Sequence, residues 1–383
     1  MRILIYSAPY YADSDFPLIK ALRSLGHEVH YMIRVAPYMT KATLLDFEPQ
    51  DQRNQVLPAS EFKALVPWGN YLDLTRSYVS NCTSGKIGIR SFRLLIKEVR
   101  AIKALAPDVI CNIDLPYDLH YPLFLVWKKR CTVVVHDPFP HSGESSFRGS
   151  IKRRIVPFCC KNFVLLNSRQ KNDFCQKYHV SPERVFVSSL GPYDCYRDFV
   201  PKTGFSQGGR FIFFWGRLSP YKGIDNAIKA FSLIRDKFPD LHFVIGGAGE
   251  PCFDLAVVEA DNRIDFIHRY LRTEEIVRYA SQCQFVVCPY TDATQSGVIQ
   301  AAFAMGAPVV ATDVGNFSEV ITDGITGLLV PPRDPVALAG AFERMLAEPG
   351  TVSTMKNNVK KAYGNSSLVW QNIAKKYLEA FEA

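Results

Sequence analysis

One stretch in the second half of the chain constrains the fold more than any other. Residues 289–315, PYTDATQSGVIQAAFAMGAPVVATDVG, contain a polar loop, a short helix that opens at Ser296, a stop at Gly306 and then an apolar strand. The run before them, QFVVC, is typical of a parallel strand that is covered on both faces. We therefore expect the polar loop at the carboxyl end of a buried strand, the edge of an open α/β sheet where ligands bind.

The helix that opens at Ser296 is a candidate phosphate site. Unpaired N–H groups and the positive end of the helix dipole point outward at a helix start. Gly297 has no Cβ, so a ligand can approach the backbone, and the hydroxyl of Ser296 can cap the helix or face a ligand. The alternative is an ordinary strand-to-helix turn in which Ser296 only caps.

A second loop carries basic residues. An apolar run at 211–215 leads into GRLSPYKG, and apolar positions of helical spacing follow from Ile224. A lysine at position 222, just before a helix start, is unfavourable against the dipole unless an anion is near; the alternative is a simply exposed lysine. Placed opposite Ser296, Arg217 and Lys222 would close a diphosphate site made of donors, without a metal.

Further features accompany this expected site. The turn at 246–250, GGAGE, lets the backbone approach a ligand closely. Asp292 and Gln300 are separated by seven residues. A carboxylate and an amide at this spacing can reach two ends of one elongated ligand, such as sugar hydroxyls and a ribose. The alternatives are a turn-forming aspartate and a partly exposed helical glutamine.

The first half of the chain shows the same alternation of strands and helices less clearly. A strand at 2–7, a helix and a strand at 27–33 make a βαβ opening that lacks GxGxxG, so a dinucleotide grip there is not supported. Asp13 and Asp15 form a DxD that could hold a metal-bound diphosphate. Acidic residues at a helix start are also favoured by the dipole, and we prefer that interpretation. Residues 37–86 show no clear period.

A histidine follows the expected strand at 132–135. Pro138 and Pro140 stiffen this loop, which would fix His136 at a carboxyl strand end facing a ligand cleft. His136 is therefore either a functional side chain or a structural histidine. His141, in the same loop, is the weaker candidate.

Composition bounds the class of protein. The 383 residues, with 48% hydrophobic content, are ample for two α/β domains that each have a core. The 10 cysteines are scattered without CxxC spacing, so neither a zinc site nor a disulfide framework is expected. The sequence has no uncharged apolar segment of membrane-spanning length and no signal-peptide cleavage site, and we expect a cytoplasmic protein.

The net charge of +8 favours an anionic partner, such as a nucleotide or a phospholipid surface. Nucleic acid is not expected, because there is no RNP-like motif, zinc-finger spacing or long basic tail. Residues 147–160 interleave basic and apolar side chains, and such a helix can lie peripherally on the inner face of an anionic membrane. A solvated helix face is the equal alternative.

These motifs together resemble glycosyltransferase family 4, whose GT-B fold has two facing Rossmann-like, doubly wound α/β domains. GRLSPYKG, VIGGAGE and the segment from QFVVC to GLLVPP carry the resemblance between residues 216 and 332. LIKALRSLGHEV, VVVHDPFPH and NSRQKNDF extend it weakly through the first half. We expect an acceptor-side domain at 1–200, a linker at 202–209 within a donor-binding domain at 201–365, and a helix at 366–383 that packs back on the first domain.

The resemblance also implies roles for individual residues. Basic side chains and helix-start amides would bind the donor diphosphate, and His136 would reach the transferred sugar. The family usually has two glutamates separated by seven residues, and here these places hold Asp292 and Gln300. The catalytic candidates are His136, Arg217, Lys222 and Asp292. The substrate-binding candidates are Gly216, Gly247, Ser296, Gly297, Val298 and Gln300.

The expected function is that of a retaining, metal-independent glycosyltransferase of the hexosyltransferase type, with no cofactor. It would move a sugar from a nucleotide diphosphate sugar to an acceptor hydroxyl, such as that of a lipid-linked glycan in surface polysaccharide synthesis. A sugar-nucleotide epimerase of the same architecture and a non-catalytic nucleotide-sugar binding protein are the alternatives. The basic loop and the phosphate-receiving loop favour the transferase.

Overall fold

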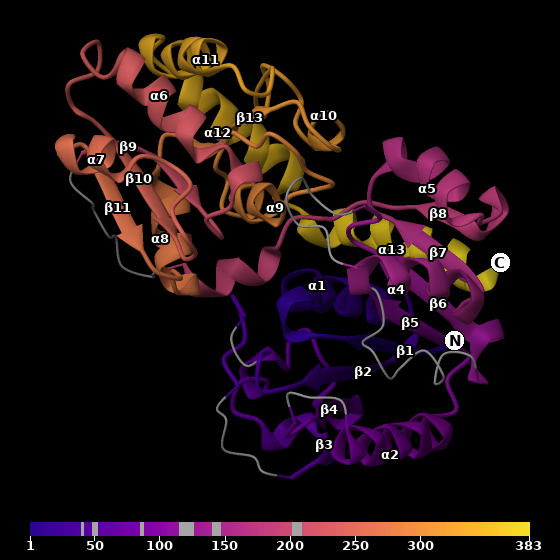
Figure 1. Ribbon diagram of the computed structural model, residues 1–383. Coiled ribbons are helices and arrows are strands. Elements are labelled where there is room, and N and C mark those ends of the chain that lie inside the picture. Colours follow the sequence, from indigo (N-terminus) through magenta and orange to yellow (C-terminus); the bar gives the residue numbers. More distant parts are fainter. Residues whose placement is uncertain (40–41, 48–52, 85–87, 115–125, 140–146, 201–208) are drawn as a thin grey trace. The chain divides into compact units, whose positions relative to one another are not determined.

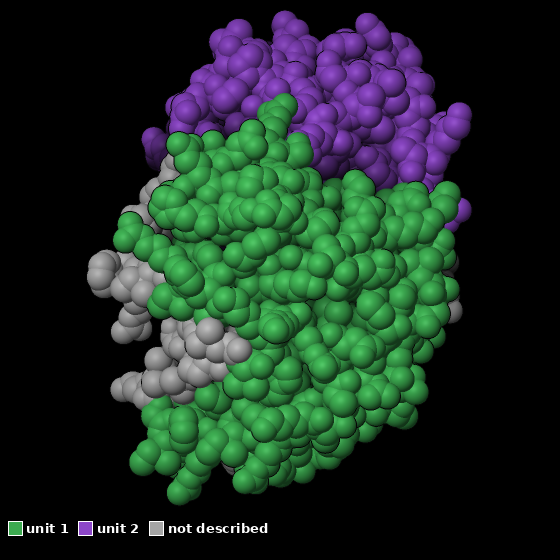
Figure 2. Space-filling model, turned by 90° about the vertical axis from the view of Figure 1, so that its right-hand side faces the viewer, with its two compact units in different colours: residues 1–140, 145–191, 367–383 green, residues 141–144, 192–366 purple. Residues whose placement is uncertain are grey.

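The computed structural model describes residues 1–39, 42–47, 53–84, 88–114, 126–139, 147–200 and 209–383, without the side chains of 147–152. These residues form two compact units, which Figure 2 colours separately. The first contains the described residues up to Gly191 and those from Ser367 to Ala383; the second runs from Pro192 to Ser366. The division falls before residue 200, and the expected linker at 202–209 lies, apart from Gly209, outside the described residues.

The first unit is built on an eight-stranded sheet. Its strands, in spatial order, are β3 (Gln55–Pro58), β4 (Ser77–Asn81), β2 (Glu28–Val35), β1 (Arg2–Ser7), β5 (Val109–Ile113), β6 (Cys131–Val135), β7 (Asn162–Leu165) and β8 (Val185–Val187). All neighbours are parallel except β3, which runs antiparallel to β4 at the edge. The central strands β1 and β5 are almost wholly buried, as a parallel sheet covered by helices requires.

Helices pack against this sheet, and both chain ends lie in the first unit (Figure 1). The helices are α1 (Ala12–Ser24), α2 (Ile89–Leu105), α4 (Phe147–Cys159), α5 (Lys171–Tyr178) and α13 (Ser366–Glu382). The Asn162 side-chain amide donates to the Ala380 carbonyl over 2.7 Å. A Cβ on Gly191 would lie 2.7 Å from the ring of Trp370. These contacts confirm that the last helix packs on the first unit.

The second unit has a six-stranded, entirely parallel sheet. Its strands, in spatial order, are β11 (Ile264–His268), β10 (Leu241–Gly247), β9 (Arg210–Trp215), β12 (Val286–Cys288), β13 (Val309–Thr312) and β14 (Gly327–Val330). Its helices are α6 (Ile224–Ile234), α7 (Leu255–Ala260), α8 (Thr273–Gln282), α9 (Gly297–Ala304), α10 (Phe317–Val320), α11 (Pro335–Ala347) and α12 (Thr351–Tyr363).

The two sheets confirm the expected α/β class with two Rossmann-like domains. In the second sheet β9 lies between β10 and β12. Because these three strands are parallel, the loops that leave their carboxyl ends meet at one edge. That edge therefore collects the loops that begin at Gly216, Ala248 and Pro289.

Candidate functional site

The loop after β9 is held against the turn after β10 by backbone contacts. The Gly216 amide donates to the Gly246 carbonyl over 3.0 Å, and the Leu218 amide donates to the Ala248 carbonyl over 2.8 Å. A Cβ on Gly247 would lie 2.2 Å from the Gly216 carbonyl oxygen. Gly216 has a φ of 139°. Glycine is thus required at both positions, which places the two loops in direct contact.

The turn before α6 is docked on the end of β12. Gly223 has a φ of +63°, and a Cβ there would lie 2.1 Å from the Pro289 carbonyl oxygen. The Thr291 amide donates to the Tyr221 carbonyl over 2.7 Å. The basic loop and the polar loop, which are far apart in sequence, therefore form one surface.

Lys222 lies close to the start of α9 because both contact Tyr290. The Lys222 Nζ is 3.8 Å from the centre of the Tyr290 ring, within the range of a cation–π interaction. The Tyr290 hydroxyl lies 3.3 Å from the Ser296 Oγ. Burial raises the pKa of Tyr290 well above its usual value, so the phenol stays neutral. The ring gives Lys222 a fixed place despite the unfavourable helix dipole nearby.

Ser296 does not cap α9 through its side chain. Within the described second unit, the Ser296 hydroxyl accepts no hydrogen bond from the first helical turn, and it instead meets Tyr290. A Cβ on Gly297 would lie 3.0 Å from the Tyr193 hydroxyl. The Tyr193 amide donates to the Gln300 carbonyl over 3.3 Å. Tyr193 therefore borders the start of α9. Val298, in the first turn of the same helix, is half-buried.

Asp292 and Gln300, the pair separated by seven residues, differ in burial. Asp292 is half-buried, whereas Gln300 is only 3% exposed. The interpretation of Gln300 as a partly exposed helical glutamine is therefore wrong, because the first turns of α9 face into the unit. Among the described residues, the Gln300 Oε1 has no hydrogen-bond partner. A buried amide oxygen without a donor costs about 1–3 kcal/mol, and a donor on a ligand would remove that cost.

Arg217 borders a cavity of about 370 Å³ between the basic loop and the turn after β10. Its lining consists of Arg217, Leu218, Ser219, Pro220, Glu250, Pro251 and Cys252. The Arg217 side chain is exposed, and the turn after β10 forms the facing wall. The His268 Nε2 lies 2.8 Å from the Gly249 carbonyl oxygen and anchors that turn. The loops after β9, β10 and β12 thus lie at one sheet edge. Lys222 is linked to the start of α9 through Tyr290, whereas Arg217 lines the cavity beside the turn after β10.

His136 lies at the carboxyl end of β6 in the first unit, and aromatic and acidic side chains hold it. Its ring centre is 4.4 Å from that of Tyr11, whose hydroxyl donates to the Asp114 Oδ2 over 2.7 Å. Asp114 adopts a φ of 62°, which is uncommon outside glycine. Burial lowers the pKa of His136, while Asp114 and Asp137 act to raise it. The net shift is downward, so the imidazole is neutral near pH 7.

Four residues that border these sites were not among the candidates predicted from the sequence: Tyr11, Asp114, Tyr193 and Tyr290. Tyr11 and Asp114 stand at the carboxyl ends of β1 and β5, and that position alone could have marked them. Tyr193 precedes the second sheet and gave no local signal. His141 lies outside the described residues.

Asp13 and Asp15 both lie in the first turn of α1, the helix start where the sequence placed them. Asp15 is 1% exposed inside α1, and its carboxyl accepts a hydrogen bond from the Tyr31 hydroxyl over 3.1 Å. Burial raises the pKa of Asp15 to about 8, so it is largely protonated at pH 7. In the part of the chain that the structure describes, no three His, Cys, Asp or Glu side chains come together as a metal site would need. No helix in that part has the length and apolarity to cross a membrane.

Residues 209–348 match the model of the family described as glycosyl transferases group 1. A curated relative from Methanocaldococcus jannaschii, an uncharacterized glycosyltransferase, is 28% identical over 57% of this chain and 59% of its own length. A D-inositol 3-phosphate glycosyltransferase from an Arthrobacter strain is 32% identical over 48% of this chain and 44% of its own length. The chain thus spans about half the length of these curated relatives.

Solved structures with the same fold cover the whole chain. Anabaena HepE, determined in complex with UDP-glucose, aligns with a TM-score of 0.64 and 16% identity over 99% of this chain and 100% of its own. A UDP-GlcNAc 2-epimerase from Neisseria meningitidis, bound to UDP-GlcNAc, aligns with a TM-score of 0.61 and 14% identity over 99% of each chain. At such identities the likeness concerns the fold alone.

Proposed function

We propose that this protein, whose residues 209–348 match the glycosyl transferases group 1 model, transfers a sugar from a nucleotide diphosphate sugar to an acceptor hydroxyl. The observation that carries the proposal is that Lys222 lies over the ring of Tyr290 while Ser296 lies beside the hydroxyl of the same residue. It brings a cation to the start of α9, where backbone N–H groups also favour an anion.

The chemistry follows from where charge develops. When the bond from sugar to diphosphate breaks, negative charge accumulates on the departing diphosphate. Lys222 as a point charge, Arg217 as a planar fork and the amides at Gly297 and Val298 would stabilise that charge in place. Such fixed donors need no metal ion, which is the basis for proposing a metal-independent reaction. Retention of configuration is proposed from the family resemblance.

Three side chains receive roles toward the rest of the donor. The buried Gln300 Oε1 needs a hydrogen-bond donor, and a ribose hydroxyl supplies one. The half-buried Asp292, at the other family position, would accept from hydroxyls of the sugar. From the family resemblance we also propose that His136, neutral near pH 7, donates an N–H to the transferred sugar. The Tyr11 and Asp114 side chains would position that imidazole.

The acceptor and the location are proposed more broadly. A lipid-linked glycan acceptor, used in surface polysaccharide synthesis at the cytoplasmic side of a membrane, fits the net charge of +8. Helix α4 supports a peripheral contact, since Ile155 and Phe158 are 40% and 67% exposed beside the exposed Arg154.

The nucleotide site is tested by calorimetric titration with UDP, GDP, ADP, CDP and dTDP in the presence of a chelator. We expect one nucleotide to bind the wild type and to be lost in the Arg217→Ala, Lys222→Ala double mutant. Equal binding by the double mutant, or binding of none of the five, would contradict the diphosphate site.

A sugar-nucleotide epimerase is the second candidate, because the fold is shared with an epimerase that binds UDP-GlcNAc. Product analysis separates the two. A transferase releases nucleoside diphosphate in step with glycosylated acceptor, whereas an epimerase converts the sugar nucleotide with no acceptor present. A protein that binds the donor and does neither would be a non-catalytic binding protein.

A further inference from the structure

Helix α2 of the first unit has one buried face and one face that is exposed to solvent. It buries Ser91, Leu94, Leu95, Glu98 and Ile102. Glu98 is the only acidic residue of the helix sequence, IRSFRLLIKEVRAIKAL, and it is fully buried. Its carboxylate accepts hydrogen bonds from the Tyr6 hydroxyl over 2.9 Å, from Arg34 over 3.2 Å and from the Ser80 hydroxyl. The outward side of α2 is left without negative charge.

The outward side of α2 carries large apolar residues. Ile89, Phe92 and Ile96 are 74%, 56% and 39% exposed. Their spacing of three and four residues puts them in one stripe along the helix. Exposed apolar residues are common singly, but a stripe of three on one helix face is a candidate contact surface.

Basic side chains lie beside this apolar stripe. Arg90, Arg93, Lys97 and Arg100, with Ile96, Asn54 and Thr83, line a hollow of about 690 Å³. The Lys97 Nζ donates to the Asn54 carbonyl over 2.8 Å, and the Asn54 side chain donates to the Arg90 carbonyl over 2.8 Å. These bonds tie α2 to the segment before β3. Among the described residues, no carboxylate forms an ion pair with the guanidinium of Arg90, Arg93 or Arg100.

We propose that the outward face of α2 is a docking surface for an anionic membrane, with Ile89, Phe92 and Ile96 entering the headgroup boundary and the three arginines binding lipid phosphates. A soluble phosphate ligand would explain the cations but not the apolar stripe. The headgroup boundary of an anionic bilayer can accommodate both the apolar stripe and the basic side chains, since interfacial helices pair an apolar face with flanking basic residues. This surface is separate from α4. The proposal depends on the proposed function in one respect only: docking would serve to bring the protein to a lipid-linked acceptor.

Liposome co-sedimentation of the full chain tests the surface without any assay of sugar transfer. We compare phosphatidylcholine vesicles with and without phosphatidylglycerol. The variant Arg90→Gln, Arg93→Gln, Arg100→Gln should weaken partitioning to the anionic vesicles by about 100-fold, because each basic residue near an anionic surface contributes about five-fold. The charge-matched control Lys361→Gln, Lys375→Gln, Lys376→Gln changes exposed lysines of α12 and α13 and should retain most of the binding.

The apolar contribution is tested separately. Phe92→Ser should weaken binding about ten-fold, whereas Val336→Ser, at a 69% exposed position of the second unit, should not. Circular dichroism confirms that each variant is folded. The proposal is overturned if the arginine variant binds anionic vesicles as wild type does, or if Arg153→Glu, Arg154→Glu on α4 abolishes binding while the α2 variants retain it. Binding to a single-stranded oligonucleotide in preference to vesicles would also overturn it.

Discussion

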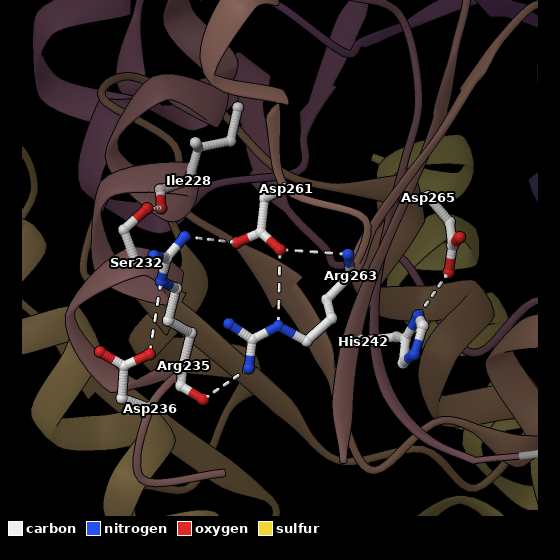
Figure 3. A network of polar contacts seen from close by, with 8 residues as sticks. All are labelled: Ile228, Ser232, Arg235, Asp236, His242, Asp261, Arg263 and Asp265. Atoms are coloured by element: carbon white, nitrogen blue, oxygen red, sulfur yellow. Dashed lines mark hydrogen bonds and ion pairs between the residues drawn. The ribbon is translucent and has the colours of Figure 1, made fainter. Parts of the chain in front are cut away.

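The two ends of the second sheet treat their polar side chains differently. At the amino end, the Asp261 carboxylate pairs with Arg235 over 3.0 Å and with Arg263 over 3.4 Å, and His242 meets Asp265 over 3.1 Å (Figure 3). At the carboxyl end, Lys222 rests on an aromatic ring and the buried Gln300 Oε1 has no partner within the described unit. Ion pairs therefore neutralise the charges at the amino end, whereas at the carboxyl end the Gln300 oxygen keeps an unused hydrogen-bond acceptor for a ligand.

One arginine at the carboxyl end refines this contrast. Arg269 follows β11, yet its guanidinium donates to both oxygens of Glu275, over 2.9 and 2.7 Å. The Arg269 hydrogen bonds, acting against burial, lower the pKa of Glu275 to about 2. The pair fixes the start of α8, and Arg269 is therefore a structural residue. Proximity to the site edge alone does not make an arginine a ligand for the donor.

The largest effect expected is from Gly223→Ala at the carboxyl end. The added Cβ would lie 2.1 Å from the Pro289 carbonyl oxygen, at a φ of +63°. We expect the free energy of unfolding to fall by about 3 kcal/mol and nucleotide binding to be lost with it. Gly340→Ala in α11 is the matched control, since its Cβ meets nothing within 4 Å. That variant should gain up to about 1 kcal/mol. Urea unfolding measures both, and equal stabilities would contradict the docked turn.

Arg217→Ala and Lys222→Ala should each lower turnover by about 100-fold, a cost of about 2.7 kcal/mol in the transition state. Their free energy of unfolding should change by no more than about 1 kcal/mol. The control is Lys237→Ala, which removes an exposed ion pair with Glu343. It should leave turnover unchanged. Wild-type turnover in either Arg217→Ala or Lys222→Ala would contradict the proposed role of that residue in stabilising the departing diphosphate.

Asp261→Asn, at the amino end, should lower the free energy of unfolding and leave nucleotide binding unchanged. Burial raises the pKa of Asp261, but hydrogen bonds from the Arg263 amide and the Arg235 side chain outweigh it, so the net shift is downward. A lowered carboxyl pKa stabilises the fold above its unfolded value of 3.8, and this stability is lost as the pH falls through the folded pKa. We expect a loss of about 2 kcal/mol at pH 7, which shrinks below about pH 4. Nucleotide affinity, measured by calorimetry, should not change.

Gln300→Leu gives the smallest and sharpest test of the comparison. Because the Gln300 Oε1 has no partner within the described unit, an apolar side chain of similar size should leave the free energy of unfolding unchanged or raise it slightly. Donor affinity should fall about ten-fold, the loss of one hydrogen bond to a ribose hydroxyl. A clear loss of stability with unchanged affinity would assign Gln300 to the core instead.

The strands of the second sheet were predictable because their burial leaves a mark in the sequence. Residues 211–215 of β9 and 243–245 of β10 are buried and form apolar runs in the sequence, and the glycines between strand and helix mark close backbone approach. Residues 37–86 show no such apolar runs and no clear period in the sequence. β3 and β4 are short, and β3 is only partly buried. Their pairing with each other and with β2 forms them, and a local pattern does not record such pairing.

The side chains around the site were predictable only in part. Arg217, Lys222 and Ser296 stand in motifs that the chain carries locally, and the sheet order places them at one edge. Tyr193 and Tyr290 are aromatic residues in loops, with nothing in their neighbourhood to distinguish them. They matter because of their neighbours: Tyr193 fills the space that a Cβ on residue 297 would need, and the Tyr290 ring lies under the ammonium group of Lys222.

The sequence by itself determined the two-domain α/β class, the carboxyl-edge loops and the types of group that could bind a diphosphate, because periodicity, glycine and charge are local properties. Only the tertiary structure decided which of those groups are neutralised. Arg269 meets Glu275, whereas the Gln300 oxygen meets no donor in the described unit. Hydrogen bonds and ion pairs form over about 3 Å, and which atoms come that close depends on how loops from different strands pack.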